Sequence, residues 1–399
     1  MRRSRVELFH HANDFLQLVH QASLILQAPG SVHDEHVDGL RTRRLQGAKD
    51  DPRRISALST RNDRTSRAFA PDFQLFDGGG PKGIAGREAS GKVLNVLAQN
   101  IPWLLGGSAD LGTSNKTLLK FEGAGSLEAG TPGGRNLHFG VREHAMAAIV
   151  NGLSLSKLRA YGATFVIFSD YARPAIRLSA LMELPAIFVF THDAMGDGED
   201  GPTHQPVEHL VSLRAIPGLT VLRPADANEV VEAYRYVLQL RHRPAVLALS
   251  RQALPTFDRR KYAPASGLAR GAYVMAESPG GTPQIILIAS GSEVALVVNA
   301  YEALTSQGVR ARVVSMPSWD IFESQPPSYR EEVLPPAIKA RLAIEQGSVL
   351  GWDRYVGPEG VVIGMKTFGA SAPLKELQRR FGFEPERVIA AARELLQRS

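Results

Sequence analysis

The sequence has no cysteine, which excludes disulfide bonds and thiolate metal sites and fits a cytoplasmic protein. No apolar run approaches the roughly 18 residues that a membrane-spanning helix needs. Aromatic residues amount to 7% of the chain, and no motif that reads nucleic acid accompanies the basic residues. We therefore expect a globular protein with no membrane segment and no nucleic-acid partner.

Positive charge concentrates at the start of the chain. Residues 1–70 contain 12 Lys and Arg residues against 8 Asp and Glu residues, and so carry +4 of the formal net charge of +6. Residues 11–26 could form one amphipathic helix, but the rest of this segment has no periodic apolar pattern. Glu7 and Asp14 argue against a transit peptide. We expect residues 1–70 to be a basic tail that is disordered or unrelated to the rest of the chain.

Residues 71–265 alternate strand-like and helix-like patterns. Short apolar runs separated by helices indicate a parallel sheet that is covered on both faces. The expected helices cover residues 87–100, 142–157, 171–183, 206–216 and 228–240. An apolar run at 103–111 ends in a glycine turn, and the expected strands cover residues 163–168, 185–193, 219–224 and 244–252. The sequence therefore predicts an α/β domain here.

Residues 266–399 predict a second, smaller α/β domain, after a proline- and charge-rich link at 254–267. A chain of 399 residues is long enough for two or three domains, each with its own core. The expected strands of this domain cover residues 284–293, 309–318, 341–346 and 360–365, and the expected helices cover residues 293–308 and 386–398.

Polar residues gather where the expected strands of the first domain end. Ligands of open parallel sheets bind at that edge. Glu143 opens a helix just after the strand-like residues 136–140, and a helix N-terminus stabilises a carboxylate. The other stretches at strand ends are Ser108–Asp110, Thr191–Asp193, 198–206 and Ser250–Gln252.

Each of these residues also has a structural interpretation. Glu143 could merely complement the helix dipole, and Ser108 could be a turn residue. His192 and His204 could be ordinary hydrogen-bonding loop residues, and Arg251 could form an exposed ion pair worth under about 1 kcal/mol. Taken one at a time, the residues leave both interpretations open.

The strand-end residues belong to six longer motifs. These are "GGSADLGTSN", "HFGVREHAMAAIVNGL", "TFVIFSDYARPAIRLSALM", "THDAMGDGEDGPTHQPVEHLVSLRAIPGLTVLRPADANE", "ALSRQ" and "RVVSMPSWDIFE". Together they resemble the transketolase family, from about residue 71, more securely from Arg87, to the C-terminus. The resemblance covers the pyrimidine-binding and C-terminal domains of that family and nothing of its first, diphosphate-binding domain. It implies a parallel-sheet pyrimidine domain followed by a smaller α/β domain.

The resemblance implies a thiamine diphosphate cofactor whose pyrimidine ring contacts this chain. Glu143 matches the glutamate that hydrogen-bonds N1′ of that ring, where a carboxyl group favours the imino tautomer. Phe165, Phe168 and Tyr171 match the aromatic pocket around the ring, although their spacing is also that of ordinary core packing. Asp110 matches a residue near the cofactor and the subunit interface.

The resemblance also implies sugar-phosphate substrates. His204 matches the histidine that faces the reacting hydroxyls, and Asp200 matches the carboxylate that reads the C2 hydroxyl of the acceptor. Arginine suits phosphate through its paired donors, and serine and histidine add directional bonds. The residues that match the phosphate-binding cluster are Arg87, Ser108, His192 and Arg251.

One motif imitates a metal site. Residues 196–198 read Gly-Asp-Gly, with Asn228 downstream, as in the motif that holds a divalent cation and the diphosphate in thiamine enzymes. The spacing is slightly long here, and Asn228 suits the start of a helix. We expect no metal ligands in this chain.

The implied reaction transfers a two-carbon ketol unit from a ketose phosphate to an aldose phosphate, in the pentose phosphate pathway. Thiamine diphosphate acts as the electron sink, and the protein supplies orientation and electrostatics. In the family the cofactor lies between the diphosphate domain of one subunit, which holds Mg²⁺ or Ca²⁺, and the pyrimidine domain of another. We therefore expect a homo- or hetero-oligomer whose site is completed by a separate diphosphate-domain chain.

Two other functions stay open. The chain could be a truncated, non-catalytic remnant or an assembly module that keeps the dimer interface. Among enzymes, dihydroxyacetone synthase shares much of "GEDGPTHQP", and deoxyxylulose-phosphate synthase is more distant.

Overall fold

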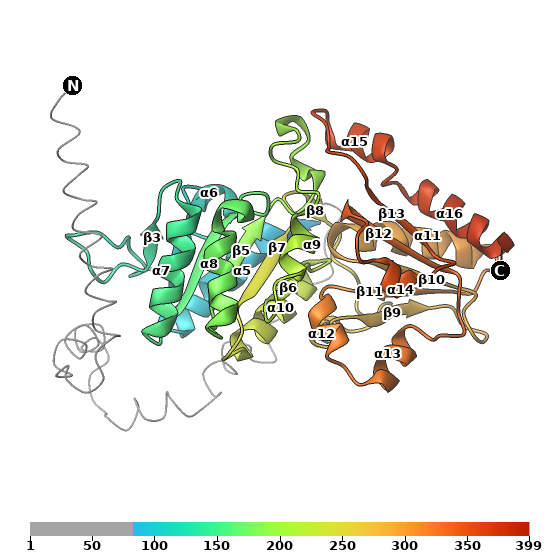
Figure 1. Cartoon of the computed structure of the whole chain (residues 1–399), viewed down its shortest axis with the longest axis horizontal. Coiled ribbons are helices and arrows are strands. Elements are labelled where there is room, and N and C mark those ends of the chain that lie inside the picture. Colours follow the sequence, from blue (N-terminus) through green and yellow to red (C-terminus); the bar gives the residue numbers. More distant parts are fainter. Residues whose placement is uncertain (1–82, 399) are drawn as a thin grey trace. The chain divides into compact units, whose positions relative to one another are not determined.

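The computed structural model describes residues 83–398. Within this range lie two α/β domains, each built on its own sheet (Figure 1). The predicted basic tail and the possible helix at 11–26 lie outside the described residues. No described helix combines the length and the apolar character that crossing a membrane requires.

The first domain is built on a six-stranded sheet with the order β3-β2-β4-β5-β7-β6. All neighbouring strands in it are parallel, and β1 and β8 form a separate antiparallel pair. The elements are β1 (Ile84–Ala85), α5 (Gly86–Asn100), β2 (Leu104–Ser108), α6 (Gly112–Asn115), β3 (Asn136–His138), α7 (Glu143–Leu155), β4 (Arg159–Phe165), α8 (Ser169–Leu181), β5 (Ile187–Thr191), the 3₁₀ helix η1 (Met195–Asp200), α9 (His209–Arg214), β6 (Thr220–Leu222), α10 (Ala227–Gln239), β7 (Ala245–Leu249) and β8 (Ala253–Leu254).

Alternate residues of each strand enter opposite cores because side chains of a strand point to opposite faces. In β5, Ile187 and Val189 pack with helices α5 and α10. Phe188 and Phe190 pack on the other face with α7 and α8. Both faces are thus covered, as the continuous apolar runs of these strands predicted.

The second domain has a mixed five-stranded sheet with the order β13-β12-β10-β11-β9, in which β9 runs antiparallel to β11. Ile285 and Leu287 of β10 face α11 and α16, and Ile286 and Ile288 face the opposite core. The elements are η2 (Ala265–Arg270), β9 (Tyr273–Glu277), β10 (Ile285–Ala289), η3 (Gly291–Glu293), α11 (Val294–Ser306), β11 (Ala311–Ser315), α12 (Trp319–Glu323), α13 (Pro327–Val333), β12 (Arg341–Ser348), α14 (Asp353–Val356), β13 (Val361–Met365), α15 (Leu374–Phe381) and α16 (Pro385–Arg398).

The structure corrects several predicted boundaries. The strand expected at 163–168 is β4, Arg159–Phe165, because the chain turns after Phe165 and the N–H of Phe168 donates to its carbonyl. The helix expected at 206–216 is the shorter α9. The antiparallel strand β9 and the short helices α12 to α15 were not predicted.

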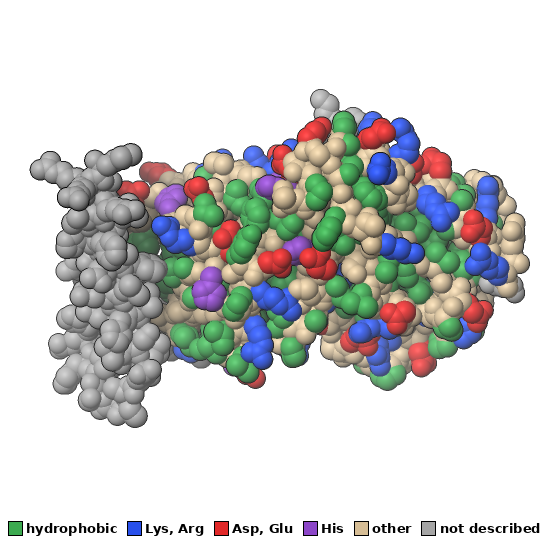
Figure 2. Space-filling view, turned by 45° about the horizontal axis from the view of Figure 1, so that its top comes forward, with side chains coloured by type: hydrophobic (Ala, Val, Ile, Leu, Met, Phe, Trp, Pro, Cys, Tyr) green, Lys and Arg blue, Asp and Glu red, His purple; other side chains and the backbone are tan. Residues whose placement is uncertain are grey.

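Charge is mixed on the described surface. Figure 2 shows Lys and Arg side chains interspersed with Asp and Glu side chains over the face toward the viewer. Binding of an anionic group to this chain therefore depends on a few locally placed side chains and not on a broad field of one sign.

Candidate active site

The residues predicted at strand ends lie at the carboxyl edge of the first sheet. Ser108 ends β2, Phe165 ends β4, His192 follows β5, and Arg251 follows β7. The pairing of β1 with β8 brings the start of α5 to the same edge, where the N–H of Arg87 donates to the Ser250 carbonyl over 3.1 Å. The topology of the sheet therefore collects residues that are far apart in the sequence.

Three aromatic rings and two imidazoles form one side of this site. The ring centroid of Phe165 lies 5.5 Å from that of Phe168 and 3.7 Å from that of His192. Phe168 lies 5.6 Å from His204 and 6.1 Å from Tyr171. Phe165 is buried, whereas Tyr171 is 64% exposed. We call Phe165, Phe168 and Tyr171 the aromatic row. Core packing accounts for the position of Phe165 but not for that of Tyr171.

A cavity of about 290 Å³ lies beside these rings. Phe168 and Tyr171 line it together with Gln205, His209 and Phe368. Its volume is near the lower end of the range for small-molecule sites, and its lining mixes aromatic and polar side chains. Because Phe368 belongs to the second domain, both domains contribute to the cavity.

Two arginines lie at another side of the site. Arg87 contacts a serine, and Arg251 pairs with a carboxylate. Arg87 donates from its guanidinium to the carbonyl oxygen of Ser114 over 3.1 Å and approaches the Ser114 hydroxyl at 3.3 Å. Arg251 is paired with Asp197, with 3.0 Å between Nε and Oδ1. Burial, and then the positive charge of Arg251, lower the pKa of Arg87. Two cations that repel each other in this way form a place that favours an anion.

Ser108 has structural partners. Its hydroxyl lies 2.6 Å from Oδ1 of Asn115 and 2.9 Å from the carbonyl of Ala163, and it accepts the N–H of Leu111 over 3.2 Å. The side chain is buried within the protein. Ser114, six residues later, is the serine beside Arg87, and this placement was not predicted.

The two ring nitrogens of His192 face different partners. The Asn115 amide donates to the Thr191 hydroxyl over 2.7 Å, and that hydroxyl lies 2.7 Å from Nδ1 of His192. The other ring nitrogen, Nε2, lies 3.4 Å from Oδ1 of Asp197. A neutral imidazole that accepts the Thr191 proton at Nδ1 carries its own proton on Nε2, toward that carboxyl group.

His192 is held as a neutral, strained residue. Burial, followed by the positive charges of Arg87 and Arg251 and by His204, lowers its pKa to about 3. Its φ of 62° lies in the left-handed region, which side chains other than glycine seldom adopt. Such strain persists where the surroundings determine the conformation, and it concentrates at functional sites.

Three predicted site residues have no hydrogen bond or ion pair that joins their side chains to these clusters among the described residues. Glu143 is the first residue of α7 and is 7% exposed, and its side chain has no hydrogen bond or ion pair among residues 83–398. Asp110 is exposed, with a φ of 62°. Asp200 ends η1 and acts on Asp197 through its charge. His204, by contrast, lies against Phe165 and Phe168.

The Gly-Asp-Gly sequence lies in η1. It contributes Asp197 to the group of side chains around Arg87, Arg251 and His192, which we call the arginine cluster. Asp197 pairs with Arg251 and His192, while Asn228 lies in the first turn of α10, behind the N-cap Asp226. One set of described side chains has potential metal-ligand atoms within 4.8 Å of one another, namely Asp170, Glu208 and His209. The Nε2 of His209 is 3.0 Å from Asp170, and this contact links α9 to α8.

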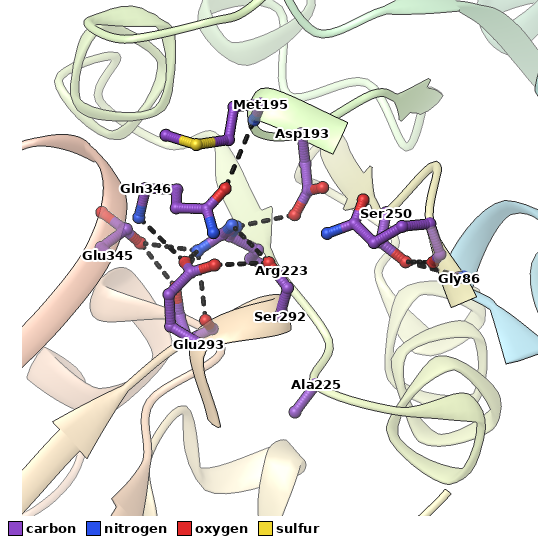
Figure 3. A network of polar contacts seen from close by, with 12 residues as sticks. Gly86, Asp193, Met195, Arg223, Ala225, Ser250, Ser292, Glu293, Glu345 and Gln346 are labelled. Carbon is purple, nitrogen blue, oxygen red and sulfur yellow. Dashed lines mark hydrogen bonds and ion pairs between the residues drawn. The ribbon is translucent and has the colours of Figure 1, made fainter. Parts of the chain in front are cut away.

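A buried ion network joins the site to the second domain (Figure 3). Arg223 follows β6 and donates from Nε to Asp193 over 2.8 Å. It also pairs with Glu293, and it lies 3.7 Å from a carboxylate oxygen of Glu345. Arg214 binds both oxygens of Glu345, each over 2.7 Å. Arg223 was not predicted as a site residue, although a charged residue directly after an apolar strand was a visible signal.

The charges in this network are compensated. Burial opposes the charge of Arg223, but Glu293, Asp193 and Glu345 outweigh it and raise its pKa. Burial also opposes the charge of Glu345, but Arg214 and then Arg223 lower its pKa to about 2. Removal of one member would leave the others buried and uncompensated, which is far more costly than losing an exposed pair.

The second domain also holds the loop that carries Asp200 and His204. The amide of Gln205 donates over 3.0 Å to the carbonyls of both Gly198 and Ala370, and the Ser371 hydroxyl donates to the carbonyl of Glu199. Gly198 has φ 58° and ψ −95°, a conformation that requires glycine. A Cβ there would lie 2.9 Å from the carbonyl oxygen of Ala372.

Gly198→Ala is therefore expected to lower the free energy of unfolding by about 2–3 kcal/mol, since it adds a close contact to the cost of a left-handed residue. Urea denaturation measures this loss. Gly218→Ala is the matched control: its φ is also positive, at 78°, but its Cβ would meet nothing nearer than 3.8 Å. We expect about 1 kcal/mol there. Equal losses would contradict a close contact at Gly198.

Comparison with known proteins identifies the family. The family described as "Transketolase, pyrimidine binding domain" matches residues 82–256, and "Transketolase-like TK C-terminal domain" matches residues 271–384. A transketolase of Halalkalibacterium halodurans is 52% identical over 331 residues, which cover 83% of this chain and 48% of that protein. The chain belongs to the transketolase family. It spans about half the length of the curated relatives that it matches.

Solved transketolases share this fold. A Pichia stipitis transketolase in complex with sedoheptulose 7-phosphate superposes with a TM-score of 0.75 at 36% identity, covering 91% of this chain and 51% of that one. A chain described as the inactive beta4 tetramer of a split-gene transketolase has a TM-score of 0.61 at 24% identity. The match covers 79% of this chain and 99% of that chain. That second likeness concerns the fold alone.

Proposed function

We propose that this chain supplies the pyrimidine-binding half of a thiamine diphosphate site and the sugar-phosphate pocket of a two-carbon ketol transferase. The observation that supports the proposal most directly is the meeting of the aromatic row with the arginine cluster at one sheet edge, with His192 common to both. An aromatic surface suits a flat heterocycle, and paired arginines suit a phosphate.

The residues present fit the pyrimidine ring of the cofactor. Phe165, Phe168 and Tyr171 offer ring faces beside a cavity. The carboxyl group of Glu143 has no hydrogen-bond or ion-pair partner among the described residues. The bound cofactor would supply the electron sink of the reaction. Glu143 would hold a proton-bearing carboxyl at N1′, and the aromatic rings would orient the heterocycle.

The residues of the Gly-Asp-Gly sequence and Asn228 do not fit the diphosphate and its cation. In the Gly-Asp-Gly sequence the carboxyl group of Asp197 is paired with Arg251 and His192, and Asn228 belongs to α10. We infer that Mg²⁺ or Ca²⁺ and the diphosphate are held by a diphosphate-binding partner, in a homo- or hetero-oligomer. The split-gene transketolase chain has the same fold and a similar extent.

For the substrate, we propose roles that follow the environment of each side chain. His204, half-buried beside the aromatic row, would donate to the reacting hydroxyls, and Asp200 would accept from the C2 hydroxyl of the acceptor. Arg87, Arg251 and His192 would bind the phosphate. We propose that Ser114 joins this cluster, because its hydroxyl is near Arg87. Ser108 would instead help to orient His192 through Asn115 and Thr191.

The test is reconstitution. The chain is mixed with the part of the Halalkalibacterium halodurans transketolase that it does not cover, thiamine diphosphate, Mg²⁺, a ketose phosphate and an aldose phosphate, and the transferred product is measured. We expect activity in the mixture and none in either component alone. Calorimetry on the chain alone should detect no micromolar binding of thiamine diphosphate. Micromolar binding there would refute a site that is shared between chains.

The same experiment separates the alternatives. A complex that forms but stays inactive would favour the non-catalytic assembly module. A mixture that accepts formaldehyde and rejects aldose phosphates would favour a dihydroxyacetone synthase.

A further inference from the structure

Asp197 is the one carboxyl group found inside the cluster to which the proposed function assigns phosphate binding, within residues 83–398. It lies in η1, only 3% of it is exposed, and its Oδ1 atom is 3.0 Å from Nε of Arg251 and 3.4 Å from Nε2 of His192. These two nitrogens carry protons that a bound phosphate would use. The carboxylate and the phosphate therefore draw on the same two side chains, and their negative charges oppose each other there.

The carboxyl group is also poorly satisfied by the protein. Neither of its oxygens has a hydrogen bond of good geometry among the described residues. A buried anion in this position is costly, and its cost grows when a second anion arrives. A buried carboxylate that merely held Arg251 in place would be expected to receive well-directed hydrogen bonds.

We propose that Asp197 is a specificity-determining residue of the phosphate cluster, whose carboxylate competes with the phosphate of the substrate for Arg251 and His192. This inference rests on the proposed function of that cluster. Ionised Asp197 weakens the binding of a phosphate and favours ligands whose terminal group is an uncharged hydroxyl. Protonated Asp197 no longer competes, because it has lost the negative charge that opposes the phosphate.

Proton binding to Asp197 therefore controls phosphate affinity near neutral pH. Burial raises the pKa of this carboxyl to about 7, with Arg251 and Arg87 opposing the shift and Asp200 and Asp193 adding to it. The carboxyl is neutral below that pH and anionic above it, so competition begins as the pH rises through about 7. The charged and titratable groups that act on it or face it are Arg87, His192, Asp193, Asp200 and Arg251.

The phosphate ligand titrates in the same range, with a second pKa near 6, so the wild-type pH profile alone is not decisive. Asp197→Asn removes the protein group and keeps its shape. The ratio of the two dissociation constants at each pH cancels the titration of the ligand. Titration of His192 does not affect the ratio between pH 5.5 and 8.5, because its own pKa lies near 3.

The experiment titrates the full chain and its Asp197→Asn variant with inorganic phosphate and with ribose 5-phosphate, by calorimetry from pH 5.5 to 8.5. We expect equal affinities at pH 5.5 and a gain on the order of tenfold for the variant at pH 8.5. Asp197→Glu, which keeps a titrating carboxyl, should follow the wild type. Asp353→Asn, which removes an exposed carboxylate from the second domain, controls for net charge and should match the wild type.

The outcomes separate this inference from the proposed function. If both proteins bind phosphate, if Arg251→Met weakens that binding, and if the affinity ratio stays near one at every pH, the competition by Asp197 is refuted and the phosphate cluster stands. If neither protein binds phosphate at pH 5.5, both the cluster and the inference fail. A ratio that rises with pH for Asp197→Asn alone supports the inference.

Discussion

Replacing Arg223 with methionine is expected to lower the free energy of unfolding by about 3–5 kcal/mol. Methionine keeps an unbranched, apolar stem but is shorter than arginine, and it removes the cation. Asp193 and Glu293 would then remain at the buried junction of the two domains without the cation that compensates them, while Glu345 would keep only its pair with Arg214. Urea denaturation of the chain, followed by circular dichroism, measures the loss.

The control is Arg330→Met. Arg330 pairs with Glu323 at 2.7 Å, but about a third of each side chain is exposed, so its removal should cost less than about 1 kcal/mol. The double variant Arg223→Met, Glu293→Gln should regain part of the loss, because one uncompensated charge is gone. Failure to regain any of it would attribute the effect to packing and refute an electrostatic origin.

The architecture of both domains was predictable because their strands are short apolar runs. Strands such as β5 and β10 are buried along their whole length, and such runs, separated by helices, leave few arrangements. The region 317–358 was less predictable, because its helices α12 to α14 have four to seven residues. Helices of that length do not show a helical period, and their formation depends on tertiary contacts.

The grouping of the candidate residues at one sheet edge was predictable, and their individual contacts were less so. The carboxyl ends of parallel strands meet at one edge, and this rule pointed to Ser108, His192 and Arg251. The rule could not distinguish Ser108 from Ser114. Strand β2 ends at Ser108, which is therefore buried, whereas Ser114 lies beyond the strand and contacts Arg87. Nor could it join Arg223 to Glu293, because 70 residues separate them in the chain.

Glu143→Gln is expected to reduce ketol transfer by the reconstituted enzyme by about 10²–10⁴-fold. The amide keeps the size of the side chain but cannot hold the acidic proton that the proposed role at N1′ requires. Product formation is measured at saturating substrate and partner. Phosphate binding by the chain alone should be unchanged, because Glu143 has no described contact with Arg87 or Arg251.

The variant also decides between the two interpretations of Glu143. If this carboxylate only complements the dipole of α7, its loss should cost a few tenths of a kcal/mol in stability and leave the reaction intact. Glu386→Gln measures the dipole contribution of an exposed glutamate in the first turn of a helix, α16. It should lose only a few tenths of a kcal/mol in stability and none of the activity. Only the substitution of Glu143 should remove activity. If the Glu143→Gln enzyme stays active, the carboxylate serves only to complement the helix dipole and the proposed role at N1′ is wrong.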